Sequence, residues 1–293
     1  SDIDQIAIME KIIENKEDLK MLKPYGDIYY YVKPVLNEIK ALKREKIDIN
    51  DFEKSIEKQE KEFENIPDKI HTKGAHNGKM KGEYIKAKEL IEKNKELLEL
   101  YEEYEKALIK DKFYDFEDMI VEVIRTLEKD NDLLLILQET YQYILADEHQ
   151  DANNAQNAIL ELLSNFHKNP NLFIVGDEKQ AIFRFQGASL ENFLYFKKLY
   201  PEAVLINLEE NYRSTQTILD ASHSLIEKNQ IPDGYKRIAL KANQKENPEP
   251  IHIIEFVNSN SENDFIVKDI EKKIKSGISP DEIAILYRDN KDA

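Results

Sequence analysis

The strongest local signal in this sequence is Ile144-Leu145-Ala146-Asp147-Glu148-His149-Gln150-Asp151, a short apolar run that ends in acidic residues. If the run is a buried parallel strand, Asp147 and Glu148 lie at the carboxyl edge of the sheet, where open α/β sheets bind their ligands. There Asp147 could hold Mg²⁺, which prefers hard oxygen ligands, and Glu148 could orient or deprotonate an attacking water. The alternative is that the acids only begin a helix, where they favour the helix dipole by roughly 0.3–1 kcal/mol. The string alone leaves both interpretations open.

Similar apolar runs recur after residue 110. They occur at Leu172–Val175 and Val204–Ile206, and helical patterns separate them at about 115–139, 152–167, 189–199 and 214–228. Strands that alternate with helices of this length predict an α/β fold whose parallel sheet is covered on both faces. After a proline-containing connector over 229–250, the runs Ile251–Val257 and Ile283–Tyr287 flank a helical pattern near 262–276 and predict the start of another α/β unit.

Residues 1–110 have a different pattern of apolar residues. Apolar residues recur there at helical spacing, and breaks are expected at Lys23–Gly26 and around 67–82. The later apolar stripe is best explained as a packing face, because its heptads are too few and too irregular for a coiled coil. We therefore expect a helical region ahead of the α/β region.

The composition narrows the classes of protein and partner. The 293 residues carry 42 basic and 58 acidic side chains, a formal charge of −16, and no cysteine. The lack of cysteine excludes disulfide frameworks, thiolate metal sites and cysteine nucleophiles. Neither a run of 18 apolar residues nor a secretory signal is present, which predicts a cytoplasmic protein without a membrane partner. At first sight the acidic balance also argues against nucleic acid as a partner.

Two further segments add polar chemistry after predicted strands. Val175–Ala188 combines polar groups with Phe183 and Phe185, and Asn211-Tyr212-Arg213-Ser214-Thr215 opens a helix. Arginine offers a fixed fork for phosphate oxygens, and an exposed aromatic ring offers a stacking face worth roughly 1–3 kcal/mol per base. From spacing alone, core packing is the stronger explanation for the two phenylalanines.

Taken in order, these three segments resemble motifs II, III and IV of the UvrD/Rep/PcrA helicases, the superfamily 1A DNA translocases. Tyr114–Met119 is similar to the Asp-Phe-x-Asp-Leu element before motif II, and Ile283–Arg288 to the strand that opens the second motor domain. The resemblance implies a partial RecA-like parallel sheet of the P-loop NTPase class with a large all-helical insertion before it. It implies a helical subdomain (1B) over 1–110, the carboxyl-side half of the first motor domain over 111–228, and a connector with the start of the second motor domain over 229–293.

The resemblance also implies a role for each matching residue. Asp147 would hold Mg²⁺, Glu148 would be the catalytic base for ATP hydrolysis, and Gln180 would sense the γ-phosphate. Tyr212 would stack on adenine, and Arg213 would contact the γ-phosphate. The implied cofactors are therefore ATP and Mg²⁺.

The implied partners are single-stranded DNA and its junction with the duplex. Phe183 and Phe185 would stack on bases, with Gln186 beside the backbone. A basic island between Lys69 and Lys88, which includes Lys73, Lys79 and Lys81, could dock on duplex phosphates. The alternative is a solvated loop that balances acidic helices. The chain departs from the family pattern with His149 where Phe is usual, Phe183 where Tyr is commoner and Gln186 where Arg is frequent.

The family's phosphate-binding loop, Gly-x-x-x-x-Gly-Lys-Ser/Thr, does not occur in these 293 residues. The expectation is an internal fragment of an ATP-dependent, 3′→5′ DNA helicase of the repair or recombination class, inactive as an ATPase by itself. One rival is a non-catalytic module, derived from a helicase, that binds DNA or protein. A weaker rival is a magnesium nuclease built on Asp147, Glu148 and Asp151, which would need further carboxylates on one metal pair.

Overall fold

The computed structural model describes residues 1–71, 78–166, 169–180, 195–229, 237–243 and 250–287. The chain divides into two compact units, Ser1–Leu205 and Ile206–Ala293, which are described separately below. The domain boundaries predicted at 110/111 and 228/229 stay predictions. Within the described residues, no helix combines the length and the apolar character that a membrane crossing requires.

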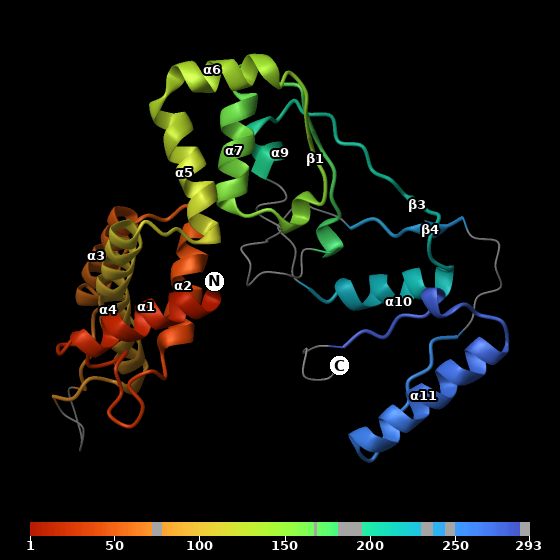
Figure 1. Cartoon of the computed structure of the whole chain (residues 1–293), viewed down its shortest axis with the longest axis horizontal. Coiled ribbons are helices and arrows are strands. Elements are labelled where there is room, and N and C mark those ends of the chain that lie inside the picture. Colours follow the sequence, from red (N-terminus) through yellow and green to blue (C-terminus); the bar gives the residue numbers. More distant parts are fainter. Residues whose placement is uncertain (72–77, 167–168, 181–194, 230–236, 244–249, 288–293) are drawn as a thin grey trace. The chain divides into compact units, whose positions relative to one another are not determined.

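The first unit begins with helices that pack on one another. They are α1 (Asp2–Asn15), α2 (Val32–Arg44), α3 (Ile49–Glu64) and the long α4 (Gly82–Asp111). Helices α1 and α3 both pack against α4, and α1 also packs against α2 (Figure 1). The breaks predicted near 23–26 and 67–82 are confirmed within the described residues, since 23–26 lies between α1 and α2, and 67–71 and 78–81 lie between α3 and α4. That this region is an insertion in a larger domain stays a prediction.

Local sequence chemistry explains where these helices begin. Ser1 forms a capping box with Asp4, and the Asp48 side chain accepts a hydrogen bond from the amide of Asp51. Each cap satisfies an amide that would otherwise lack a partner in the first helical turn. The helices then bury apolar side chains against one another in a single core, whose fully buried members include Met9, Ile13, Ile39 and Leu100.

The rest of the first unit alternates helices and short strands. In chain order these are α5 (Phe116–Lys129), α6 (Asn131–Thr140), β1 (Ile144–Ala146), the 3₁₀ turn η1 (His149–Asp151), α7 (Asn154–Ser164), β2 (Leu172–Ile174), η2 (Glu178–Gln180) and α9 (Tyr195–Leu199). Strands β1 and β2 are parallel, with Ile144 opposite Leu172 and Ala146 opposite Ile174. The parallel pairing predicted from the apolar runs is confirmed for these two strands.

Two expectations for the sheet are wrong. The run Val204–Ile206 forms no strand and is largely exposed, because none of the described segments pairs with it. The sheet is also not covered on both faces, since Leu145 and Phe173 are 74% and 57% exposed. A parallel strand is stable only when neighbours supply its hydrogen bonds and cover its faces, and the described residues supply both only in part.

The second unit contains β3 (Glu210–Asn211) parallel to β4 (Lys241–Ala242), then α10 (Gln216–Ile226) before β4, α11 (Ser259–Lys275) and the turn η4 (Pro280–Glu282). The helices predicted at 214–228 and 262–276 are confirmed. The runs Ile251–Val257 and Ile283–Tyr287 form no strand in the structure. None of the described residues from 206 onward is buried, so this unit has no apolar core of its own within the described part of the chain.

Candidate functional site

Asp147 and Glu148 lie where β1 ends, as the sequence predicts. Both side chains are exposed, and Asp147 Oδ1 accepts a hydrogen bond of 2.9 Å from the amide of Glu148. Glu148 has a left-handed backbone, with φ at 49°, which is uncommon for a residue other than glycine. The tight turn therefore carries two exposed acidic residues in succession at the carboxyl edge of the strand pair.

Backbone hydrogen bonds tie this turn to the end of β2. The Val175 amide donates to Ala146 O over 2.8 Å, and the His149 amide donates to Val175 O over 3.0 Å. The segment that follows β1 therefore lies directly against the segment that follows β2. This arrangement brings together the first two of the motif-like segments, as expected for neighbouring parallel strands.

A buried amide makes a second link between the same two segments. Gln150 is 1% exposed, and its Nε2 donates to Glu148 Oε2 while its Oε1 accepts a 3.0 Å hydrogen bond from the amide of Asp177. Sequence reasoning did not assign a role to Gln150. The available signal was its position, two residues after an exposed acid in a segment with few other uncharged donors.

Asp177 organises the turn that carries Gln180. Its Oδ1 accepts from the Lys179 amide and its Oδ2 accepts from Gln180 Nε2, both over 3.0 Å. The Gln180 amide also donates to Asp177 O over 2.9 Å. The Gln180 side chain is thus held beside Asp177, on the segment that Gln150 joins to Glu148. The other residues predicted in this segment, Phe183, Phe185 and Gln186, lie outside the described residues.

Behind the turn, His149 is buried with polar and aromatic neighbours. Its Nε2 lies 2.8 Å from Asn157 Oδ1 on α7, and its ring lies 5.4 Å from the ring of Phe196 on α9. Burial lowers the pKa of His149, although the contact with Asn157 acts in the opposite direction. His149 therefore packs between η1, α7 and α9, which fits a position where the resembling family has Phe.

Tyr212 and Arg213 belong to the second unit. Asn211 Oδ1 accepts from the amides of Arg213 and Ser214, over 3.0 and 2.7 Å, and so fixes the turn that precedes α10. Tyr212 Oη donates to Glu210 Oε2 over 2.7 Å, and this hydrogen bond raises the pKa of Tyr212. Both the Tyr212 ring and the Arg213 side chain are exposed. Their placement relative to Asp147 and Glu148 involves two different units and is not described.

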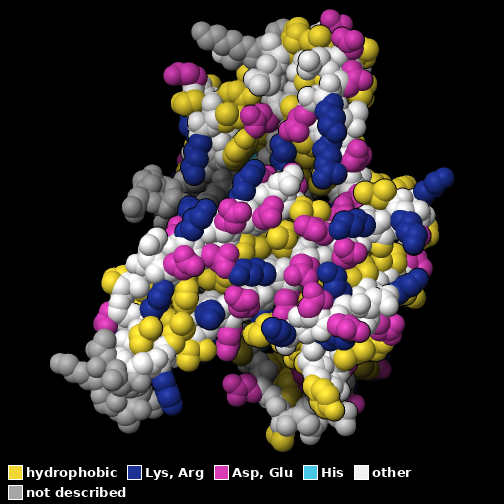
Figure 2. Space-filling model, turned by 90° about the vertical axis from the view of Figure 1, so that its left-hand side faces the viewer, with side chains coloured by type: hydrophobic (Ala, Val, Ile, Leu, Met, Phe, Trp, Pro, Cys, Tyr) yellow, Lys and Arg dark blue, Asp and Glu magenta, His cyan; other side chains and the backbone are white. Residues whose placement is uncertain are grey.

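The basic island is partly neutralised within the described residues. Lys81 pairs with Asp68 over 2.9 Å, and Lys69 Nζ donates to the carbonyl oxygens of Phe63 and Glu64 at the end of α3. Lys79 is exposed, and Lys73 lies outside the described residues. On the face shown in Figure 2, basic and acidic side chains are interspersed. One of the lysines proposed for duplex contact, Lys81, therefore already has an acidic partner.

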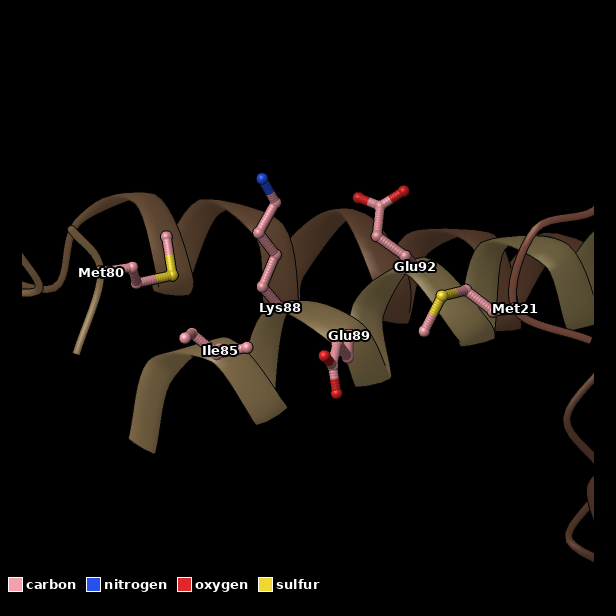
Figure 3. A pocket seen from close by; sticks show the side chains of 6 residues that line it. All are labelled: Met21, Met80, Ile85, Lys88, Glu89 and Glu92. Atoms are coloured by element: carbon pink, nitrogen blue, oxygen red, sulfur yellow. The ribbon is translucent and has the colours of Figure 1, made fainter. Parts of the chain in front are cut away.

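A shallow hollow of about 320 Å³ lies at the start of α4, where the basic island ends. Met21, Met80 and Ile85 line it together with the charged residues Lys88, Glu89 and Glu92 (Figure 3). None of the predicted nucleotide-site residues lines this hollow.

The carboxylates of the turn fit a magnesium ion that keeps most of its water. Asp147 offers an exposed hard oxygen at a strand end, which is the ligand that Mg²⁺ prefers. Within the described part of the chain, no group of three or more His, Cys, Asp or Glu side chains converges as a metal site.

Comparison with known proteins agrees with the order of these segments. A family model of the UvrD/REP helicase N-terminal domain matches residues 3–201, and one of the UvrD-like helicase C-terminal domain matches residues 206–293. Similar proteins include the ATP-dependent DNA helicase PcrA of Staphylococcus aureus, 39% identical over 193 residues, and that of Staphylococcus epidermidis, 38% identical over 193 residues. These matches cover 65% of this chain and 25% of each relative, so the chain spans about a quarter of the length of the relatives it matches. Because the first family model alone matches more than half of its length, the chain belongs to the UvrD/REP helicase family.

Proposed function

We propose that this chain is part of an ATP-dependent DNA helicase that moves 3′→5′ along single-stranded DNA in repair or recombination. The observation that carries the proposal is the hydrogen-bonded connection of Glu148 to Gln180 through Gln150 and Asp177, in a chain that two helicase family models match in order. A helicase must couple nucleotide hydrolysis to movement. Hydrogen bonds that connect the turn carrying Glu148 to the turn carrying Gln180 suit that requirement.

In this proposal the residues of the β1 turn act on the nucleotide. Asp147 would hold the magnesium ion, which neutralises phosphate charge when it is bound. Glu148 would orient and deprotonate the attacking water, since its exposed carboxylate follows directly after Asp147. Gln180 would contact the γ-phosphate through the amide that Asp177 holds in place.

Residues of the second unit would contact the adenine base and the γ-phosphate of the nucleotide. The exposed Tyr212 ring suits stacking on adenine, and the exposed Arg213 suits contact with the γ-phosphate. The Asn211 turn supports these roles because it fixes the backbone from which both side chains extend.

Single-stranded DNA and its junction with duplex are the proposed partners. Phe183, Phe185 and Gln186 are proposed to contact the single strand, by stacking and beside its backbone. On the helical region, Lys79 is the stronger candidate for duplex phosphates, because Lys81 already pairs with Asp68. Lys73 is also proposed to contact the duplex phosphates.

The central experiment measures DNA-stimulated ATP hydrolysis by the complete protein that contains this sequence. Glu148→Gln should lower kcat by about 100-fold or more, the scale of a lost general base, while ATP binding persists. Glu139→Gln, an exposed acid on α6, is the matched control and should leave kcat unchanged. Wild-type kcat in the Glu148 variant would contradict the proposal, and DNA binding without any ATP hydrolysis by the complete protein would favour the non-catalytic module.

A separate measurement tests the chain by itself. It contains no Gly-x-x-x-x-Gly-Lys-Ser/Thr sequence, whose amides cradle nucleotide phosphates in this family. We expect the purified 293-residue chain to release no phosphate from ATP with or without single-stranded DNA. Phosphate release that Glu148→Gln abolishes would show that this expectation is wrong.

The duplex contact is tested by salt titration. Lys79→Glu should weaken duplex binding and reduce the slope of log K against log salt by about 1, the value expected for one lost phosphate contact. Lys54→Glu is the control, because Lys54 is an exposed lysine on α3 that pairs with Asp51. An unchanged slope for Lys79→Glu would remove Lys79 from the DNA interface.

A further inference from the structure

The side-chain amide of Gln150 makes two hydrogen bonds, one through its nitrogen and one through its oxygen. Its side chain is 1% exposed, so water cannot replace a lost partner easily. The Asp177 amide can only donate a hydrogen bond, so Gln150 Oε1 faces it, and Gln150 Nε2 is left to donate to Glu148 Oε2. The orientation of the Gln150 amide is therefore determined, since turning it over would break both hydrogen bonds.

The two partners belong to the two turns that carry the proposed nucleotide chemistry. On one side, Gln150 Nε2 contacts Glu148, whose left-handed backbone already restricts where its carboxylate can lie. On the other side, the Asp177 carboxylate holds the Gln180 amide over 3.0 Å. A continuous path of hydrogen bonds thus runs from the Glu148 carboxylate to Gln180, and Gln150 is the member that crosses between the turns.

We propose that Gln150 is a positioning residue for the hydrolysis reaction: it fixes the Glu148 carboxylate and ties its orientation to the turn that carries Gln180. The inference rests on the proposed function, since it assumes that Glu148 is the base. Gln150 acts through Glu148 and contacts no reacting atom. Proton abstraction requires the carboxylate in one orientation, and a free Glu148 side chain would sample several.

The test uses the complete protein, with Gln150→Met as the first variant. Methionine fills a similar volume but makes neither hydrogen bond. We expect kcat for DNA-stimulated ATP hydrolysis to fall by about 10- to 100-fold, the effect of a misplaced catalytic group, while KM for ATP changes by less than about 3-fold. Gln138→Met is the matched control, because Gln138 is also buried and donates to Leu162 O on α7, away from the turn.

Combining substitutions separates positioning from a general structural role. If Gln150 acts only through Glu148, then Gln150→Met should change the slow kcat of Glu148→Gln by less than about 2-fold, measured with radiolabelled ATP. Independent effects that multiply in the double variant would overturn the inference. So would equal losses of kcat in the Gln150 and Gln138 variants, which would reflect damage to the fold.

A second variant keeps the test decisive if Gln150→Met folds poorly. Gln150→Asn keeps the amide group but shortens the side chain by one methylene, so it cannot reach both Glu148 and Asp177; kcat should again fall, while no charge is buried and the fold is retained. Wild-type kcat in Gln150→Asn would also overturn the inference. Normal kcat in Glu148→Gln would instead contradict the proposed function itself, so the two failures are distinguishable.

Discussion

The helical region (residues 1–111) and the strand region (residues 143–180) of the first unit bury opposite kinds of side chain. The hydrophobic core cluster of the helical region extends from Met9 to Leu108. In the strand region every described buried side chain except Ala155 is polar, for example His149, Gln150 and Asn157, while Leu145 and Phe173 are exposed. The apolar core stabilises the helical region by removing apolar surface from water. The buried polar side chains of the strand region orient its loops through hydrogen bonds.

This difference separates stability from the proposed chemistry. Apolar packing is not directional, so the helical region can tolerate small shifts of its side chains. The hydrogen bonds of Gln150 and His149 are directional, so they hold Glu148 and the Asp177 turn in one geometry. We infer that substitutions in the helical region act mainly on the free energy of unfolding, and those at the β1 turn mainly on kcat.

A buried charged cluster lies at the end of α2, at the boundary between the helical region and the α/β region. Lys43, 2% exposed, contacts Glu105, Asp115 and Asp118 with Nζ–O distances of 2.7, 2.7 and 2.5 Å. Burial alone would lower the pKa of Lys43, but the three carboxylates outweigh it and raise that pKa. Asp115 and Asp118 also form the capping box of α5. One lysine thus joins the helical region to the element that begins the α/β region.

The last residue of α2 and the two residues after it extend this junction. Arg44 pairs with Glu117, Glu45 accepts from Asn154 at the start of α7, and Lys46 pairs with Glu128. Four consecutive residues, Lys43 to Lys46, therefore contact segments at least 60 positions away in the sequence. The junction reaches the helix that directly follows the β1 turn.

The largest expected effect is at this junction. Lys43→Met would leave three carboxylates without their shared cation, which should lower the free energy of unfolding by about 3–5 kcal/mol. Lys54→Met, which loses only the exposed pair with Asp51, should change it by less than about 1 kcal/mol. Urea unfolding followed by circular dichroism measures both. Similar losses in the two variants would show that the buried junction contributes no more to the free energy of unfolding than an exposed ion pair does.

A pair of leucines compares the two regions directly. Leu100→Ala on α4 removes a fully buried side chain and should cost about 2–5 kcal/mol through lost burial and the cavity left behind. Leu145→Ala on β1 removes a mostly exposed side chain and should change the free energy of unfolding by no more than about 0.5 kcal/mol. A large loss for Leu145→Ala would mean that the outer face of β1 is covered in solution.

A smaller effect is expected at the start of α7. Asn153 caps this helix in a capping box with Gln156, so Asn153→Ala should lower the free energy of unfolding by about 1 kcal/mol. Asn171→Ala, at an exposed position before β2, is the control and should have little effect. Thermal unfolding of the two variants in parallel would reveal the difference, and equal midpoints would contradict it.

The smallest effect concerns pH. Burial raises the pKa of Glu105, despite the nearby Lys43, so the folded state binds this proton more tightly than the unfolded chain. The stability contributed by this group is present below the ordinary pKa and is lost as the pH rises through the raised pKa. Glu105→Gln keeps an oxygen near Lys43 and cannot titrate. Its free energy of unfolding should therefore fall less than that of the wild type between pH 4 and 7, and an unchanged pH dependence would contradict the assignment.

Part of the fold could be predicted because its determinants are local. The apolar runs around Leu145 and Phe173 are short and bounded by polar residues, and both form the parallel strands expected of them. The helix starts at Asp115 and Asn153 follow from side chains that cap their own helices. The run Val204–Ile206 has the same apolar character but forms no strand, because pairing depends on a neighbour that local sequence does not specify.

The sequence by itself determined the parallel strands β1 and β2, the position of Asp147 and Glu148 at a strand end, and the order of the three helicase-like segments. Only the tertiary structure decided that Gln150 is buried between Glu148 and Asp177, and that Lys43 is enclosed by carboxylates 62 to 75 positions away. The physical reason is that helix caps and apolar periodicity act between residues a few positions apart. Burial of a polar side chain is stable only when distant segments supply its partners, and those meet only in the folded chain.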